Sequence, residues 1–259
     1  MSGEPMQIKN DFLQDVAEGK VPGYSIVHKF GAGDLTTSLT PISQGNSYKT
    51  PTAATELEFV SGSDNDQAGG SGAQEITVIG LDANWEESIE TFETNGTTPV
   101  VLGEELTRLY RWYVSRSGTY ASQTAGSHSG TLTLRESGGG DIWSTIITTP
   151  FAIGQSQIGV YTIPAGKTGY LLSKHIFTDT SKTADIYFYQ RPNADDVSTP
   201  FSGTMRLVER EVGVTGGYEL TTKTPKGPFV GPCDIGFMGK VSTGTAECSV
   251  EFELLIKDS

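Results

Sequence analysis

Residues 155–192 read QSQIGVYTIPAGKTGYLLSKHIFTDTSKTADIYFYQRP and decide the fold class of this 259-residue chain. The stretch contains three apolar runs, 157–164, 168–177 and 184–192, that are rich in Ile, Val, Tyr and Phe. Two turn signals, Pro-Ala-Gly-Lys and Asp-Thr-Ser-Lys-Thr, separate these runs. Short apolar runs bounded by Gly, Pro, Asp and Ser are typical of antiparallel β-strands.

The same pattern continues on both sides of this stretch. Residues 56–60 alternate between polar and apolar side chains, and Asn95-Gly96 is a strong signal for a two-residue hairpin turn. The segment 247–257 alternates most regularly, which indicates a half-buried strand with its charged face in water. We therefore predict an all-β protein with no long helix.

The spacing of the predicted strands and the turn residues between them divide the chain into two β-sandwiches. We place a boundary at Thr149-Pro150. The strands of 51–150 predict an immunoglobulin-like sandwich, and those of 151–259 predict a jelly-roll-like sandwich. Residues 1–50 lack a strong period and are interpreted as an N-terminal arm.

The arm contains the candidate partner-binding residues. A short helix is expected near residues 11–19, with Asn10 or Asp11 as its N-cap and Gly19 as its C-cap. An extended segment follows this helix. The apolar side chains of the helix and of the extended segment must be buried against another surface. Two alternatives are open: the arm binds a partner or a neighbouring subunit, or it lies across its own sandwich. The residues concerned are Phe12, Leu13, Val16, Tyr24, Ile26, Val27 and Phe30.

Charge and composition exclude several classes of partner. The chain carries 31 Asp and Glu against 18 Lys and Arg, a net charge of −13. Binding to a nucleic-acid backbone needs clustered Lys and Arg, whereas the basic residues here are scattered. The N-terminus shows no basic and apolar leader, and no run approaches the roughly 18 apolar residues of a membrane span. We expect no nucleic-acid partner, no signal peptide and no membrane span.

Candidate chemical sites are weak in this sequence. Residues 64–75 resemble a calcium-binding EF-hand loop. However, Ala68 occupies a ligand position, and predicted strands, not helices, flank the loop. A solvated hairpin loop is therefore the favoured interpretation, and whether the loop binds calcium is left open. The three histidines lie far apart and lack ligand spacing. Carboxylates such as Asp185, Asp195 and Asp196 are common in an acidic protein. We therefore predict no enzyme, no cofactor and no metal site.

Two further sets of residues have a structural and a functional interpretation. Tyr187, Tyr189 and Arg191 share one face of a predicted strand and would suit a sugar ring or a partner protein. Burial of that face in the protein core is the favoured alternative. Cys233 and Cys248 would face each other if their strands formed a hairpin, but two small buried apolar residues are the favoured interpretation.

Six stretches that span most of the chain carry a family resemblance. They are FLQDVAEGKVPGYSIVHKFG (12–31), GAQEITVIGLDANWEESIETFETNGTTPV (72–100), RLYRWYVSRSGT (108–119), AGSHSGTLTLRE (125–136), QIGVYTIPAGKTGYLL (157–172) and DIGFMGKVSTGTAECSVEFELLIKD (234–258). Together they resemble virion structural proteins of tailed bacteriophages, especially those of marine and aquatic phages. The resemblance implies that this protein is part of the virion. It implies no active-site residue.

The functional hypothesis combines this resemblance with the residue patterns. We expect a non-enzymatic capsid decoration or cement protein that binds the major capsid protein or other virion proteins and stabilises the head shell. The alternative is a neck or tail component, such as a fibre or receptor-binding protein that contacts host surface glycans. Assembly in the bacterial host cytoplasm suits the small number of cysteines. A homo-oligomer is expected, and analogy with phage accessory proteins implies a trimer.

Overall fold

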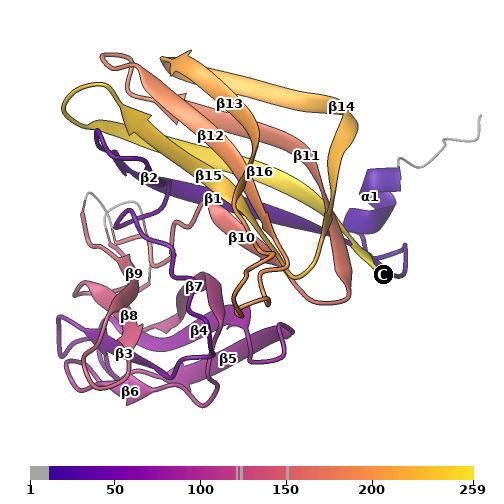
Figure 1. Cartoon of the computed structure of the whole chain (residues 1–259). Helices are drawn as coiled ribbons and strands as arrows, with labels where there is room; N and C mark the ends of the chain where they lie inside the picture. The colour runs from indigo at the N-terminus through magenta and orange to yellow at the C-terminus, as the bar shows by residue number, and fades with distance from the viewer. Residues whose placement is uncertain (1–11, 121, 123–124, 150–151) are drawn as a thin grey trace, which may run out of the picture.

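The structure is a computed structural model that describes residues 12–120, 122, 125–149 and 152–259 (Figure 1). Its one helix in this part of the chain is α1 (Phe12–Ala17), and every other regular element described is a β-strand. The prediction of an all-β protein is therefore confirmed. The predicted N-cap residues Asn10 and Asp11 lie outside the described residues.

Eight strands form a jelly roll of two antiparallel sheets, ordered β1-β16-β11-β14 and β10-β15-β12-β13. The chain changes sheet at every connection except the one between β12 and β13, which is the strand arrangement of a jelly roll. A short additional strand, β2 (Thr40–Pro41), pairs with β15. The eight strands are β1 (Tyr24–Leu35), β10 (Val160–Ile163), β11 (Lys167–Thr178), β12 (Ala184–Pro192), β13 (Arg206–Val214), β14 (Gly216–Val230), β15 (Cys233–Val241) and β16 (Ala246–Asp258).

Strand β1 comes from the segment that the sequence analysis assigned to the arm. It pairs with β16 along its whole length, from Tyr24 opposite Lys257 to Leu35 opposite Ala246. The backbone N–H and C=O groups along this edge of β16 need partners, and β1 supplies them. Residues 24–35 are thus the first strand of the jelly roll, and residues 51–150 are inserted between its first two strands.

The inserted residues form a second sandwich below the jelly roll in Figure 1. Its sheets are ordered β6-β3-β8-β9 and β5-β4-β7. The total of seven strands suits an immunoglobulin-like domain, but this strand order differs from the immunoglobulin one. The strands are β3 (Leu57–Ser61), β4 (Ala73–Leu81), β5 (Glu87–Glu93), β6 (Val100–Val101), β7 (Arg108–Ser117), β8 (Leu132–Glu136) and β9 (Ile142–Ile146).

The two sandwiches share their apolar cores. Leu81 and Tyr110 belong to the inserted sandwich but are buried in the main cluster between the jelly-roll sheets. Conversely, Ile158, Val160 and Tyr189 of the jelly roll are buried in the cluster of the inserted sandwich. Because neither core closes without residues of the other sandwich, the described chain packs as one body.

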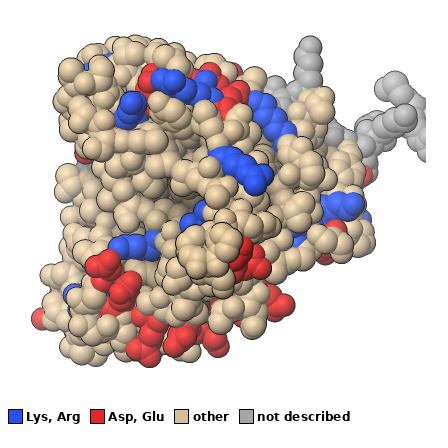
Figure 2. All heavy atoms as spheres, in the orientation of Figure 1, with Lys and Arg blue, Asp and Glu red and all other residues tan. Residues whose placement is uncertain are grey.

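Charge is distributed unevenly between the two parts. Residues 51–150 contain 14 Asp and Glu, four Arg and no Lys, so they carry a net −10 of the total −13. Figure 2 shows acidic side chains gathered over the inserted sandwich at the lower end of the molecule. The jelly roll and the inserted sandwich therefore present chemically different surfaces.

The two cysteines do not face each other in a hairpin. Cys233 lies on β15 and Cys248 on β16, and these strands belong to different sheets. Both thiols are free and buried. Burial raises the pKa of the Cys233 thiol to about 12 and that of the Cys248 thiol to about 11. The interpretation of the pair as two small buried residues is confirmed.

Two glycines interrupt the apolar pattern of β1 because neighbouring backbone lies very close. A Cβ atom at Gly31 would lie 2.2 Å from the backbone N of Gly159 and 2.3 Å from the carbonyl oxygen of Ile42. At Gly33 it would lie 2.4 Å from the carbonyl oxygen of Ser43. These glycines allow the segments around Ile42, Ser43 and Gly159 to pass close to β1. They also interrupt the alternation of side chains by which a strand is predicted from sequence.

Replacing Gly31 by Ala should lower the free energy of unfolding by about 1–3 kcal/mol, because backbone atoms cannot move aside as flexible side chains can. Gly62→Ala is the matched control, since its Cβ would meet no atom closer than 3.5 Å. Urea denaturation measures both variants. Equal unfolding midpoints for the two would contradict the close approach.

Candidate functional site

Helix α1 packs against the outer face of the sheet that contains β1, β16 and β11. Val16 is buried there together with Leu172 and Leu255. The rings of Phe12 and Tyr24 meet edge to face, with their centroids 5.4 Å apart. This small apolar cluster holds the helix to its own jelly roll.

The helix ends where the sequence predicts. Gly19 has a φ of 71°, and its N–H donates to the carbonyl oxygen of Val16, while Lys20 N–H donates to that of Asp15. This pair of hydrogen bonds is a Schellman motif, in which glycine tolerates the left-handed conformation. The prediction of Gly19 as C-cap is confirmed, and the turn directs the chain into β1.

The structure divides the candidate partner-binding residues into two groups. Val16 is buried, Tyr24 and Ile26 pack beside it, Val27 packs against the main core and Phe30 is half-buried. Val16, Tyr24, Ile26 and Val27 thus pack on the protein's own jelly roll, which is the alternative in which the arm lies across its own sandwich. Phe12 and Leu13 remain 47% and 37% exposed, respectively, and are the first two residues of α1.

A fully buried ion pair joins the two sandwiches. Arg108 of β7 and Asp234 of β15 are 0% and 2% exposed. The guanidinium donates from Nε to Oδ1 at 2.8 Å and from Nη2 to Oδ2 at 3.1 Å. Such a two-pronged contact fixes the relative orientation of both groups. The Arg108 guanidinium also lies 4.7 Å from the centre of the Trp85 ring.

Other polar groups complete the environment of Asp234. Thr162 donates its hydroxyl to Oδ1 at 2.7 Å, and Arg191 Nε lies 3.2 Å from Oδ2. The Tyr48 hydroxyl is 2.8 Å from that of Thr162. Burial and the nearby Asp234 carboxylate raise the pKa of Tyr48 above its ordinary value. This network was not predicted from the sequence, although an arginine within the apolar run of β7 was a usable signal.

A second contact between the sandwiches uses Lys29 of β1. Its side chain is 3% exposed, and Nζ donates a hydrogen bond to the carbonyl oxygen of Tyr110. Nearby, Arg111 Nη2 donates to the carbonyl oxygen of His28 at 2.7 Å. Burial, with the nearby Arg111 charge, holds the pKa of Lys29 well below its ordinary range. This lysine is therefore a costly charge inside the junction.

The loop that resembles an EF-hand is organised by its own hydrogen bonds. Asp66 is fully buried, and Oδ1 accepts from the N–H groups of Ala73 and Ser129. Oδ2 accepts from the Ser61 hydroxyl and the Gly130 N–H. With four donors on its two oxygens, Asp66 serves as a structural centre of the loop.

The remaining sequence candidates are dispersed. Within the described residues no three His, Cys, Asp or Glu side chains gather as a metal site. Asp185 pairs with Arg210, whereas Asp196 accepts hydrogen bonds from Ser202. No helix of the described chain has the length and apolar character to cross a membrane.

The aromatic face of β12 is divided between two environments. Tyr189 is buried in the core cluster of the inserted sandwich, and Arg191 lies beside Asp234. Tyr187 instead stacks under Arg210, whose guanidinium is 5.1 Å from the ring centre. The favoured interpretation of burial is confirmed for Tyr189, so these residues do not form one exposed aromatic surface.

Comparisons with known proteins give only distant matches. No protein-family model and no curated protein matches the chain. The solved structures include PBSX exported protein XepA, at 10% identity and a TM-score of 0.20, covering 88% of this chain and 86% of that one. An infectious bursal disease virus structure of the Gx strain shows 11% identity and a TM-score of 0.22, covering 91% and 77%.

A third solved structure, of infectious bursal virus derived T=1 particles, shows 12% identity and a TM-score of 0.22, covering 91% of this chain and 74% of that chain. Two of these three solved structures are thus of viral particles. The jelly-roll assignment rests on the strand order of the two sheets.

The buried ion pair leads to a stability prediction. Asp234→Asn should lower the free energy of unfolding by about 3–5 kcal/mol, because Arg108 would keep a buried charge without its carboxylate. Asp141→Asn removes the carboxylate of a solvent-exposed pair with Lys49 and should leave the unfolding midpoint unchanged. Chemical denaturation followed by tryptophan fluorescence measures both, and a wild-type midpoint for Asp234→Asn would refute the role of the pair.

The lowered pKa of Lys29 predicts a pH-dependent stability. Between the pKa of Lys29 in the folded protein and about 10.4 in the unfolded chain, the unfolded chain binds the additional proton, so stability rises with pH. Lys29→Met should be more stable than wild type near neutral pH, and this advantage should shrink as pH approaches about 10. Denaturation of both proteins across this range tests it; a difference that does not vary with pH contradicts the prediction.

Proposed function

We propose that this protein is a non-enzymatic structural component of a tailed-phage virion, a decoration protein on the exterior of the head shell. The observation that carries the proposal is the rigid combination of a jelly roll and an inserted acidic sandwich, joined through a buried ion pair and shared cores. Jelly rolls are widely used in viral capsid domains, though also in lectins, so the fold supports the role by analogy.

The two ends of this body suit different tasks. Phe12 and Leu13 are the exposed apolar residues of α1, which lies on the jelly roll and not on the inserted sandwich (Figure 1). We assign them to contact with the major capsid protein or a neighbouring subunit. The inserted sandwich, with its net −10, projects away from the shell and repels nucleic acid.

Self-association belongs to the same proposal. Two apolar side chains form a small contact, which gains strength when a symmetry axis repeats it. We propose a homo-oligomer, a trimer by analogy with phage accessory proteins. In this arrangement the protein bridges neighbouring capsid subunits and adds buried interface that resists internal pressure.

The alternative is a neck or tail component that binds host glycans. The burial of Tyr189 and the contact between Arg191 and Asp234 remove one of the surfaces that the sequence offered for it. Electron cryomicroscopy of the particle distinguishes the two locations. Density for the protein on the tail alone would overturn the decoration proposal.

The attachment surface is tested by changing Phe12 and Leu13 together to Ser. We expect binding to particles that lack the protein to weaken about tenfold or more, because apolar anchors dominate such contacts. Ile89→Ser is the control, since Ile89 is 62% exposed on β5 of the inserted sandwich and should not affect attachment. Sedimentation with particles measures binding, and light scattering measures oligomeric mass.

The two readouts separate the two parts of the proposal. Wild-type attachment by the Phe12 and Leu13 double variant would show that α1 does not contact the shell. Wild-type protein that stays monomeric at high concentration would refute the homo-oligomer.

A further inference from the structure

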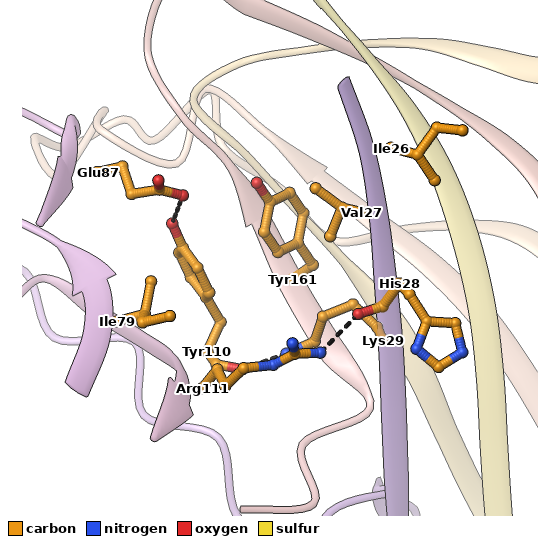
Figure 3. A pocket seen from close by; sticks show the side chains of 9 residues that line it. All are labelled: Ile26, Val27, His28, Lys29, Ile79, Glu87, Tyr110, Arg111 and Tyr161. Atoms are coloured by element: carbon orange, nitrogen blue, oxygen red, sulfur yellow. Dashed lines mark hydrogen bonds between the residues drawn. The ribbon is translucent and has the colours of Figure 1, made fainter. Parts of the chain in front are cut away.

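A cavity of about 200 Å3 lies between the two sandwiches, where β1 faces β4, β5 and β7 (Figure 3). Typical pockets for drug-sized ligands measure roughly 300–1,000 Å3, so this cavity would hold only a small molecule. Val27, Ile79 and the ring of Tyr161 give it apolar walls, while Lys29 and Arg111 bring positive charge to it.

The two cations of the cavity lack a carboxylate partner within the described chain. Lys29 donates to the carbonyl oxygen of Tyr110, and Arg111 donates to that of His28. An ammonium group has three donors, so a single carbonyl leaves Lys29 with unused hydrogen-bonding capacity. A buried charge without a counter-charge is costly and is therefore uncommon in proteins.

The other buried cations of the described chain are neutralised. Arg108 pairs with Asp234 at 2.8 Å. Lys174, which is 1% exposed, pairs with Glu209 at 3.0 Å and with Glu211 at 2.9 Å. Lys29 differs from both because it lines a cavity, where an external anion has room to take the place of the missing carboxylate.

The one carboxylate on the cavity wall is already engaged. Glu87 accepts a hydrogen bond from the Tyr110 hydroxyl at 2.8 Å, and its side chain is exposed to solvent. The rings of Tyr110 and Tyr161 lie next to each other, with centroids 4.8 Å apart. Burial raises the pKa of both tyrosines, so they stay neutral and add no competing negative charge.

We propose that this cavity binds a small organic carboxylate, a ring-sized acid whose carboxylate pairs with Lys29 and Arg111. Its apolar body packs against Val27, Ile79 and Tyr161. Binding neutralises the buried ammonium and fills space between β1 and the inserted sandwich, so the ligand stabilises the junction. The site is independent of attachment to a particle.

Benzoate is the probe, and isothermal titration calorimetry of the full-length protein is the measurement. A ligand of this size is expected to bind with a dissociation constant of about 1 mM or below. Benzamide, which has the same ring without the charge, should bind at least about tenfold more weakly. Saturating benzoate should also raise the thermal unfolding midpoint, because it binds only the folded protein.

Two variants test the pairing, and a third serves as control. Lys29→Met and Arg111→Gln should each weaken benzoate binding about tenfold or more. Arg116→Gln changes another arginine of β7, which pairs with Glu93 at the surface and does not line the cavity, so affinity should stay at the wild-type value. Circular dichroism of each variant verifies folding.

The proposal is overturned if wild-type protein shows no binding up to roughly ten times the expected dissociation constant. Equal affinity of wild type and a folded Lys29→Met variant also overturns it. Should Lys29→Met fail to fold, Arg111→Gln decides alone, since its guanidinium is partly exposed and its loss leaves the core intact.

Discussion

The buried pair between Arg108 and Asp234 is the constraint on which the arrangement of the two sandwiches depends. Each charge is removed from water, so neither sandwich can bury its member of the pair without the other sandwich in place. Proteins in which such a pair is replaced by hydrophobic residues are often equally stable. We therefore attribute to the Arg108–Asp234 pair the selection of one relative orientation of the sandwiches, more than a gain in net stability. The shared apolar clusters add hydrophobic stabilisation to the junction.

Strand β1 connects all parts of the molecule. One side of its backbone pairs with β16, its first residues pack with α1, and its central residues face the inserted sandwich. Gly31 allows the returning chain to cross at backbone contact distance, and Lys29 reaches Tyr110 in the inserted sandwich. The segment that begins as α1, with Phe12 and Leu13 exposed, thus continues into the strand that lines the junction cavity.

The shared apolar cores join the jelly roll, which carries α1, to the acidic inserted sandwich. In the cavity at the junction, a small anion would contact both sandwiches at once. A ligand there would stabilise the contact between the two sandwiches by supplying a counter-charge to Lys29, as Asp234 does for Arg108.

The sequence by itself determined the local features of this protein. Strand periodicity predicted the all-β class, the alternation of 247–257 predicted β16, and Gly19 predicted the end of α1, because these depend on neighbouring residues alone. Only the tertiary structure decided that 24–35 is a jelly-roll strand, since Gly31 serves a contact with Gly159, more than a hundred positions away. It also brought Arg108 to Asp234 and left Lys29 without a carboxylate partner among the described residues. Pairing between distant strands fixes these contacts, and no local pattern records it.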